Sequence, residues 1–176
     1  MALKRAHVEK WAANALPGET VISYVVTSTF TPSGPAIVAG GWILVHTRSP
    51  ELGDEQRSDL ITHLGLDREK RLQVQSQSTL LVLTGRQLVL ATRSALNRPK
   101  DILHSGPVEQ IRVHWFDHDA GSGNRFRHFV TEFGDGHWRS DRSGLTALGR
   151  DLKASNADDF VSALGDKAIE VTNGQV

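Results

Sequence analysis

Two short apolar runs joined by a tight connection constrain the fold of this chain most. They occupy residues 80–83 and 88–91, and the segment Thr84-Gly85-Arg86-Gln87 separates them. Apolar runs of this length bounded by turn residues are typical of buried strands, and a short connection around a glycine is typical of a β-hairpin. Because the runs are apolar throughout and do not alternate, we expect the hairpin to be covered on more than one side.

Further strands are predicted before and after this hairpin. In chain order they are residues 20–30, 42–47, 108–116, 125–133 and 137–140. The first is dense in β-branched and aromatic residues, which pack well on a pleated surface. We expect a loop at residues 117–124 and a hairpin turn at Gly134-Asp135-Gly136, where glycine supplies positive φ angles. The pattern predicts an antiparallel meander.

Helices are predicted at the two ends of the chain. The first has an apolar stripe formed by Val8, Trp11, Ala12, Ala15 and Leu16, and it stops at Pro17-Gly18. The last follows a Ser155-Asn156 cap, and its stripe consists of Ala157, Phe160, Val161, Leu164 and Ala168. A shorter helix around Leu60 and Leu64 is expected within residues 48–78, which we interpret as an insertion between strands.

Composition limits the classes of function. Lys plus Arg and Asp plus Glu number 20 each, whereas a protein that binds a phosphate backbone normally carries a basic excess, so we expect no nucleic-acid partner. The chain has no cysteine, which fits a reducing cytoplasm. Its longest apolar stretch, residues 35–45, is much shorter than the roughly 20 residues that cross a bilayer. We predict one cytoplasmic domain over residues 1–176.

Three segments together resemble a known family. They are Leu16-Pro17-Gly18-Glu19, the hairpin Leu81-Val82-Leu83-Thr84-Gly85-Arg86-Gln87-Leu88, and the final helix with Phe160-Val161-x-Ala163-Leu164. In this order they look like bacterial pleckstrin-homology-like domains of the PH/GRAM superfold, over residues 16–168. In that family the hairpin usually reads Thr-Asp-Arg-Arg, whereas here Gly85 and Gln87 replace charged residues. The insertion at residues 48–78 is a second departure.

The resemblance implies an α+β fold that is mostly antiparallel β. The expected architecture is a PH-like bent sandwich or barrel closed by the C-terminal helix, with an extra N-terminal helix. The resemblance also implies a non-enzymatic role in binding or self-assembly. Likeness of fold is an associational argument for function, so the residues are considered separately.

One stretch contains the residue types that bind metals. His114, Asp117, His118 and Asp119 lie close together in the sequence, and His128 or His137 could join them from neighbouring strands. Imidazole and carboxylate together bind zinc or a harder divalent ion. The same stretch is also typical of a solvated hairpin tip, which is the preferred interpretation. The sequence therefore predicts no metal site and no cofactor.

Catalytic motifs are missing from the sequence. It contains no Gly-x-Ser-x-Gly nucleophile elbow and no His-Glu-x-x-His pair. We therefore predict no catalytic residues, and keep a small metal-dependent enzyme built around His114 and His118 as an alternative.

Basic residues near the predicted hairpins form a candidate anion-binding rim. The candidates are Arg86, Arg125 and Arg127. Lipid-binding members of the wider superfold hold phosphoinositide headgroups in such a place. Interspersed carboxylates dilute this positive potential, so ordinary solvated charge is the preferred interpretation. A peripheral membrane module that binds anionic lipid is the alternative.

The apolar segment at residues 35–45 is a candidate contact surface. Two adjacent glycines interrupt it, and glycine weakens the interior of a strand. The segment is therefore either a strand with a bulge or a partly exposed apolar hairpin that contacts another subunit or a membrane. The contact candidates are Ile37, Val38, Trp42 and Ile43.

The leading hypothesis from the sequence is a non-enzymatic PH-like binding or self-assembly module with an unknown ligand. A homo-oligomer is the expected state, and a protein partner or a membrane surface is the expected contact.

Overall fold

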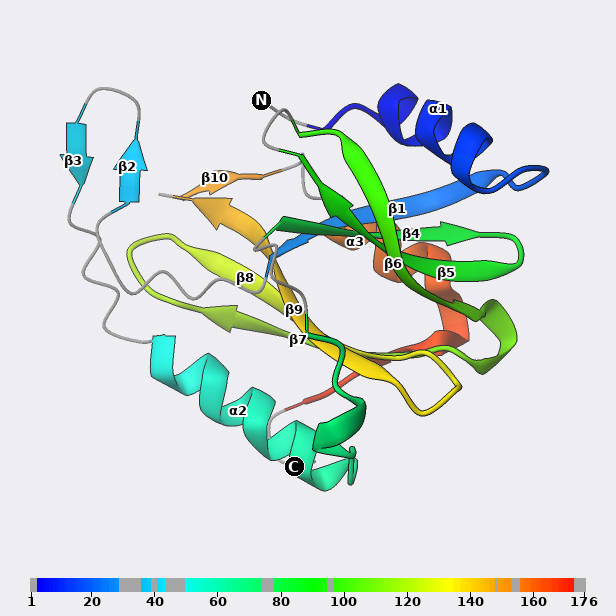
Figure 1. Ribbon diagram of the computed structural model, residues 1–176. Coiled ribbons are helices and arrows are strands. Elements are labelled where there is room, and N and C mark those ends of the chain that lie inside the picture. Colours follow the sequence, from blue (N-terminus) through cyan, green and yellow to red (C-terminus); the bar gives the residue numbers. More distant parts are fainter. Residues whose placement is uncertain are drawn as a thin grey trace.

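The computed structural model describes residues 3–28, 36–38, 41–43, 50–73, 78–94, 97–147, 149–152 and 156–172. These residues form an α+β fold in which a large, mostly antiparallel sheet carries three α-helices (Figure 1). The helices are α1 (Arg5–Ala15), α2 (Pro50–His63) and α3 (Ala157–Leu164), and the short 3-10 turns are η1 (Arg68–Lys70), η2 (Val108–Gln110) and η4 (Gly165–Lys167).

The main sheet has nine strands. Eight follow the order β11-β7-β8-β9-β1-β4-β5-β6, and β10 pairs with β9. The bounds are β1 (Val21–Ser28), β4 (Ser78–Thr84), β5 (Gln87–Arg93), β6 (Pro99–Pro107), β7 (Arg112–Asp119), β8 (Arg125–Glu132), β9 (Trp138–Ala147), β10 (Arg150–Asp151) and β11 (Ala168–Glu170). Only the β11–β7 pair is parallel among the described strand pairs. A separate two-stranded sheet consists of β2 (Ala36–Val38) and β3 (Gly41–Ile43).

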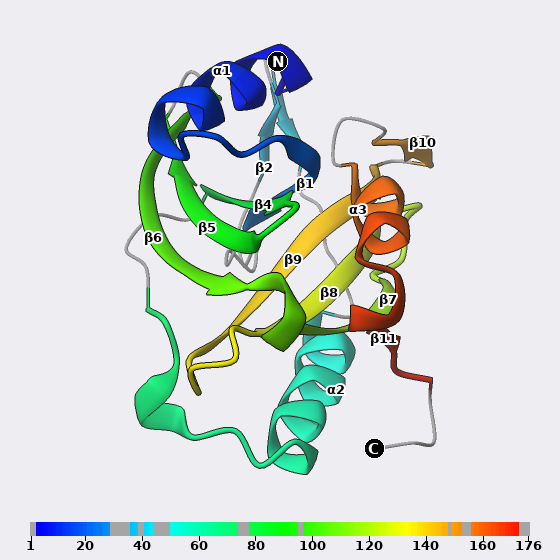
Figure 2. The same ribbon diagram turned by 90° about the vertical axis from the view of Figure 1, so that its right-hand side faces the viewer.

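The main sheet bends at β1. This strand pairs with β4 along its length but with β9 at one position, where Ser28 lies opposite Arg142. The β4–β6 part and the β7–β9 part therefore turn toward each other (Figure 2). A buried apolar cluster lies between them and includes Leu81, Leu90 and Phe129. Burial of these side chains stabilises the bend.

The predicted β4–β5 hairpin is confirmed, and so is its cover on both faces. Leu81 and Leu83 face the central cluster, whereas Leu80 and Val82 belong to a second cluster on the outer face. Helix α1 supplies the cover there through Val8 and Ala12, and Leu16, which follows the helix, packs in the same cluster. The continuous apolar runs follow from this double burial.

Helix α2 covers the outer face of the other half of the sheet. Its Leu60 packs in a third cluster with Phe116, Val130 and Trp138. Helices α1 and α2 thus lie on opposite sides of the molecule (Figure 2). The predicted short helix near Leu60 is therefore confirmed, although it begins earlier, at Pro50. No helix in the described ranges combines the length and the apolar character needed to cross a bilayer.

The barrel closure expected from the resemblance is wrong. Within the described residues, β6 and β11 are the two edges of the sheet, and they do not pair with each other. Helix α3 does pack into the central cluster, where Phe160 meets Phe129 edge to face. It ends at Leu164, however, because Gly165 has a φ of 60° and terminates the helix. Ala168, predicted to lie on the helix, is the first residue of β11.

Two strand predictions also need correction. The expected loop at residues 117–124 begins later, because β7 continues to Asp119. Strand β6 was not predicted. It is an edge strand with mostly exposed side chains, so its sequence lacks the apolar pattern of a buried strand. Strand β3 (Gly41–Ile43) overlaps the first two residues of the strand predicted at residues 42–47. Residues 44–47 lie outside the described part.

Candidate metal centre

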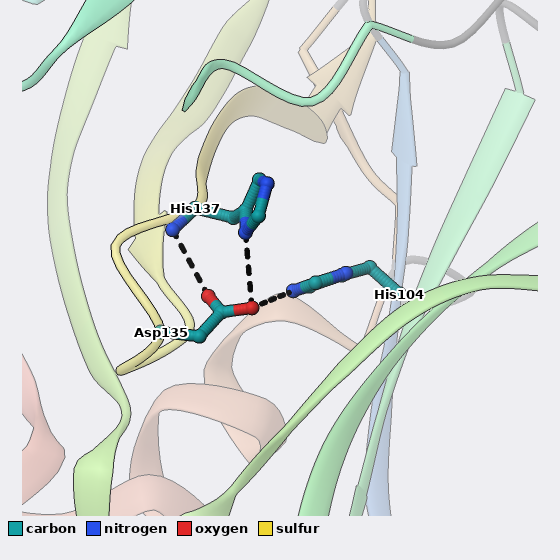
Figure 3. Close-up of side chains that lie close together, drawn as sticks. All are labelled: His104, Asp135 and His137. Atoms are coloured by element: carbon teal, nitrogen blue, oxygen red, sulfur yellow. Dashed lines mark hydrogen bonds and ion pairs between the residues drawn. The ribbon is translucent and has the colours of Figure 1, made fainter. Parts of the chain in front are cut away.

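His104, Asp135 and His137 converge on one point. Each offers one ligand atom, and these atoms lie within 4.8 Å of one another, the one such group found among the described residues. Oδ2 of Asp135 lies 3.0 Å from Nε2 of His104 and 3.0 Å from Nδ1 of His137 (Figure 3). The carboxylate therefore sits between two imidazoles.

The β8–β9 turn supplies two of these residues. Gly134 and Gly136 flank Asp135 with φ angles of 82° and 87°, in a region that favours glycine, as the sequence predicted. The backbone N–H of His137 donates to Oδ1 of Asp135 at 2.9 Å, and its ring Nδ1 is 3.0 Å from Oδ2. The turn thus presents a carboxylate and an imidazole side by side.

Strand β6 supplies the third residue, and Gly106 allows its close approach. A Cβ atom on Gly106 would lie 2.2 Å from the carbonyl oxygen of Phe133, so only glycine lets β6 pass this backbone. Phe133 also meets the ring of His104 edge to face, with centroids 4.9 Å apart. These contacts hold His104 against the turn that carries Asp135 and His137.

The surroundings of the three side chains favour the binding of a cation. Nε2 of His104 is buried and has no hydrogen-bond partner, because its contact with Asp135 lacks hydrogen-bond geometry. Partial desolvation acts to raise the pKa of Asp135, but the hydrogen bonds from His137 and the charges of His104 and His137 lower it below its ordinary value. The carboxylate is therefore ionised at neutral pH. Nε2 of His104 forms no hydrogen bond with a described residue.

This donor set fits a transition-metal ion. Two imidazoles with one carboxylate form a common three-ligand set for zinc, with a fourth position left open. Bonds of about 2.0 Å in a tetrahedral arrangement separate donor atoms by roughly 3.3 Å. The two 3.0 Å contacts in the cluster are close to this separation.

The residues that the sequence offered as an alternative metal site do not converge. Because β7 extends through Asp119, strand alternation turns His114 and His118 to the face opposite Asp117 and Asp119. His114 is buried and its Nε2 lies 3.0 Å from Glu132. Asp117 instead accepts two hydrogen bonds from Arg127.

The two further histidines considered with that set, His128 and His137, also lie apart from each other. His128 is buried beneath α2 and stacks on Phe116, with ring centroids 4.8 Å apart. His137 joins His104 and Asp135 instead.

The three predicted anion-binding residues are also separated. Arg86 is exposed at the β4–β5 turn, next to the start of β1, where Val21 pairs with Thr84. Arg125 and Arg127 lie on β8, and its neighbour β9 meets the opposite end of β1.

The positive charge of Arg127 is also neutralised by neighbouring carboxylates. Its guanidinium pairs with Asp117 and Asp158 and lies 4.2 Å from the centre of the Trp115 ring. Burial alone would lower its pKa, but these two carboxylates raise it. Arg125 lies 3.5 Å from the same Asp117. The three arginines therefore do not form a common rim.

The predicted contact residues lie in the separate hairpin. Ile37 and Val38 are in β2, Trp42 and Ile43 are in β3, and Ile37 is opposite Trp42. Their side chains lie outside the described part of the structure, as do the flanking residues 35, 39–40 and 44–45.

Sequence reasoning missed His104 and the role of Asp135. The signal for the turn was present in Gly134-Asp135-Gly136-His137, which places a carboxylate and an imidazole two residues apart. The partner was not visible, because His104 lies on an edge strand without an apolar pattern. The sequence matches no known family model and no curated protein.

Proposed function

We propose that this protein is a non-enzymatic binding module whose ligand is a divalent transition-metal ion, with zinc as the best fit. The convergence of His104, Asp135 and His137 from two separate parts of the sheet carries the proposal. Imidazole nitrogens select zinc and its neighbours over magnesium and calcium, which prefer oxygen ligands. The proposal departs from the sequence-based expectation of no metal because different residues supply the ligands.

The position of the cluster gives the metal a structural consequence. In the sheet, β6 and β8 are separated by β9, β1, β4 and β5, yet both ends meet at His104 and the β8–β9 turn. An ion bound there would tie the open edge strand to the opposite half of the bent sheet. Metal binding would then stabilise the folded state by mass action.

The direct test is zinc binding by the metal-free protein. Isothermal titration calorimetry should show one zinc per chain, and binding should weaken by at least about tenfold in His104→Ala and Asp135→Asn, because each loses one of three ligands. His63→Ala is the control, since His63 is exposed at the end of α2. Equal zinc affinity in all four proteins would contradict the proposal.

A second candidate function is self-assembly, as the resemblance to PH-like domains suggests. The β2–β3 hairpin favours it, because this hairpin forms its own two-stranded sheet and stands apart from the main sheet (Figure 1). A hairpin containing Ile37 and Trp42 offers an apolar contact to a second copy of the chain. Metal binding and assembly are compatible, since they involve different residues.

A further inference from the structure

Among the described residues, a groove beside α2 is lined by two arginines and by no acidic side chain. It has a volume of about 580 Å³ and lies between the C-terminal half of α2, η1 and β9. The polar and aromatic groups that line it include Ser58, Arg68, Arg71, Gln73 and Trp138. A second cavity, near α3, instead contains Asp117, Asp151, Asp158 and Asp159. The groove beside α2 is thus the more cationic of the two.

Arg71 and Trp138 form the wall of this groove. The guanidinium of Arg71 lies 5.6 Å from the centre of the Trp138 ring, a cation–π arrangement. The indole is fixed, because its Nε1 donates to the carbonyl oxygen of Asp67 at 2.7 Å. Among the described residues, neither Arg71 nor Arg68 forms an ion pair, so no described carboxylate competes with a ligand for their guanidinium groups.

Two further arginines lie behind the wall, and each already has an acidic partner. Arg57 pairs with Asp54, and Arg139 pairs with Asp141. Nη2 of Arg139 is buried and has no hydrogen-bond partner among the described residues. Burial lowers the pKa of Arg71, and repulsion by Arg57 and Arg139 lowers it further against the opposing attraction of Asp141. An anion in the groove would relieve this crowding of positive charge.

We propose that this groove binds an oxyanion, a phosphate or carboxylate group, with Arg71 and Arg68 as its charged partners. Guanidinium groups hold such oxygens through paired, charge-assisted hydrogen bonds. The hydroxyl of Ser58 and the amide of Gln73 supply further donors at the rim. This site uses none of the metal-centre residues, so its success or failure is independent of metal binding.

Inorganic phosphate is the probe for the test. Metal ions are first removed from protein and buffers with a chelating resin, and thermal unfolding is then followed with phosphate and with chloride at equal ionic strength. Wild-type protein should be stabilised by phosphate and not by chloride. The double variant Arg68→Gln/Arg71→Gln should bind phosphate at least about tenfold more weakly. Arg86→Gln is the control, since Arg86 is exposed at the β4–β5 turn.

The single variant Arg68→Gln guards against a loss of folding caused by removing the Arg71–Trp138 contact. Arg68 lies on η1, where no residue is buried. The variant should therefore be as stable as wild-type protein and still bind phosphate more weakly. Phosphate stabilisation that is equal in wild-type protein and both variants, or absent from wild-type protein, would overturn the proposal.

A vesicle experiment identifies the source of the anion. Flotation with phosphatidylcholine vesicles that contain phosphatidylinositol phosphate is compared with phosphatidylcholine alone. Binding that requires the anionic lipid and is displaced by phosphate supports the site and assigns it to a lipid headgroup. Phosphate binding without flotation supports the site and assigns it to a soluble anion. Flotation that survives in the double variant contradicts the proposal, because the lipid would then bind elsewhere.

Discussion

His128 shows how one buried side chain makes stability depend on pH. Its exposure is 1%, and neither ring nitrogen has a hydrogen-bond partner in the part of the chain that the structure describes. Desolvation, followed by repulsion from Arg57, Arg142 and His118, lowers its pKa to about 3. The folded state therefore keeps this imidazole neutral at pH values where the unfolded chain, with an ordinary pKa near 6.5, binds a proton.

The sign of the pH effect follows from this difference. The contribution of His128 is favourable above about pH 6.5 and is lost as the pH falls toward 3. Between pH 7 and pH 5 the free energy of unfolding should decrease by about 2 kcal/mol from this group alone. Urea titrations at both pH values measure it. His128→Phe, which leaves no polar group unpaired, should show a smaller decrease, whereas His63→Gln should behave as wild type. An equal decrease in His128→Phe would assign the effect to other groups.

At the scale of elements, the path of β6 depends on Gly106. In Gly106→Ala the new methyl would lie 2.2 Å from the carbonyl oxygen of Phe133, so β6 must move away from the β8 end. This displacement separates His104 from Asp135. We expect a loss of about 1–3 kcal/mol in stability and weaker zinc binding, measured by denaturant titration and calorimetry.

Gly85→Ala, in the β4–β5 turn, is the control for this substitution. Its Cβ would have no neighbour within 4 Å, so it should change neither quantity. Zinc affinity unchanged in Gly106→Ala would show that β6 does not position His104.

The self-assembly that we propose as a second function would depend on the β2–β3 hairpin. If Trp42 anchors a contact between subunits, Trp42→Asp should reduce the particle mass in light scattering while circular dichroism stays unchanged. If Trp42 is instead part of a core, the same substitution buries an unpaired charge and unfolds the protein. A variant with unchanged mass and unchanged fold would remove the assembly proposal.

At the scale of the whole molecule, the proposed metal ion at His104, Asp135 and His137 would link the two halves of the bent sheet. With zinc at about 100 times its Kd, the folded state gains about 2.7 kcal/mol, which corresponds to roughly 5–10 °C in Tm for a chain of this size. Zinc-loaded protein should therefore lose this increment on addition of EDTA, as differential scanning calorimetry measures. His104→Ala should be insensitive to both additions. A Tm that EDTA leaves unchanged in zinc-loaded wild-type protein would show that the cluster contributes nothing to the fold.

Local features were predictable because they depend on neighbours in the sequence. The apolar runs around Gly85 predicted the β4–β5 hairpin and its double burial, and the spacing of Phe160 and Leu164 predicted α3. The glycines around Asp135 predicted a turn through their positive φ angles. In each case a repeat of side-chain type or a conformational preference acts over a few residues, so the sequence contains the whole signal.

Contacts between distant segments were decided only by the tertiary structure. The bend at β1 leaves the sheet open where the resemblance implied a barrel. The path of β6, which no periodicity marked, brings His104 to Asp135 and His137, whereas strand alternation separates His114 from Asp117. Which strands meet depends on how all the apolar faces are buried together, and a one-residue shift in the register of a strand turns its side chains to the opposite face. Thus the sequence by itself determined the buried strands, the helices and the turn, whereas the packing of the complete sheet determined the path of β6 and the candidate site.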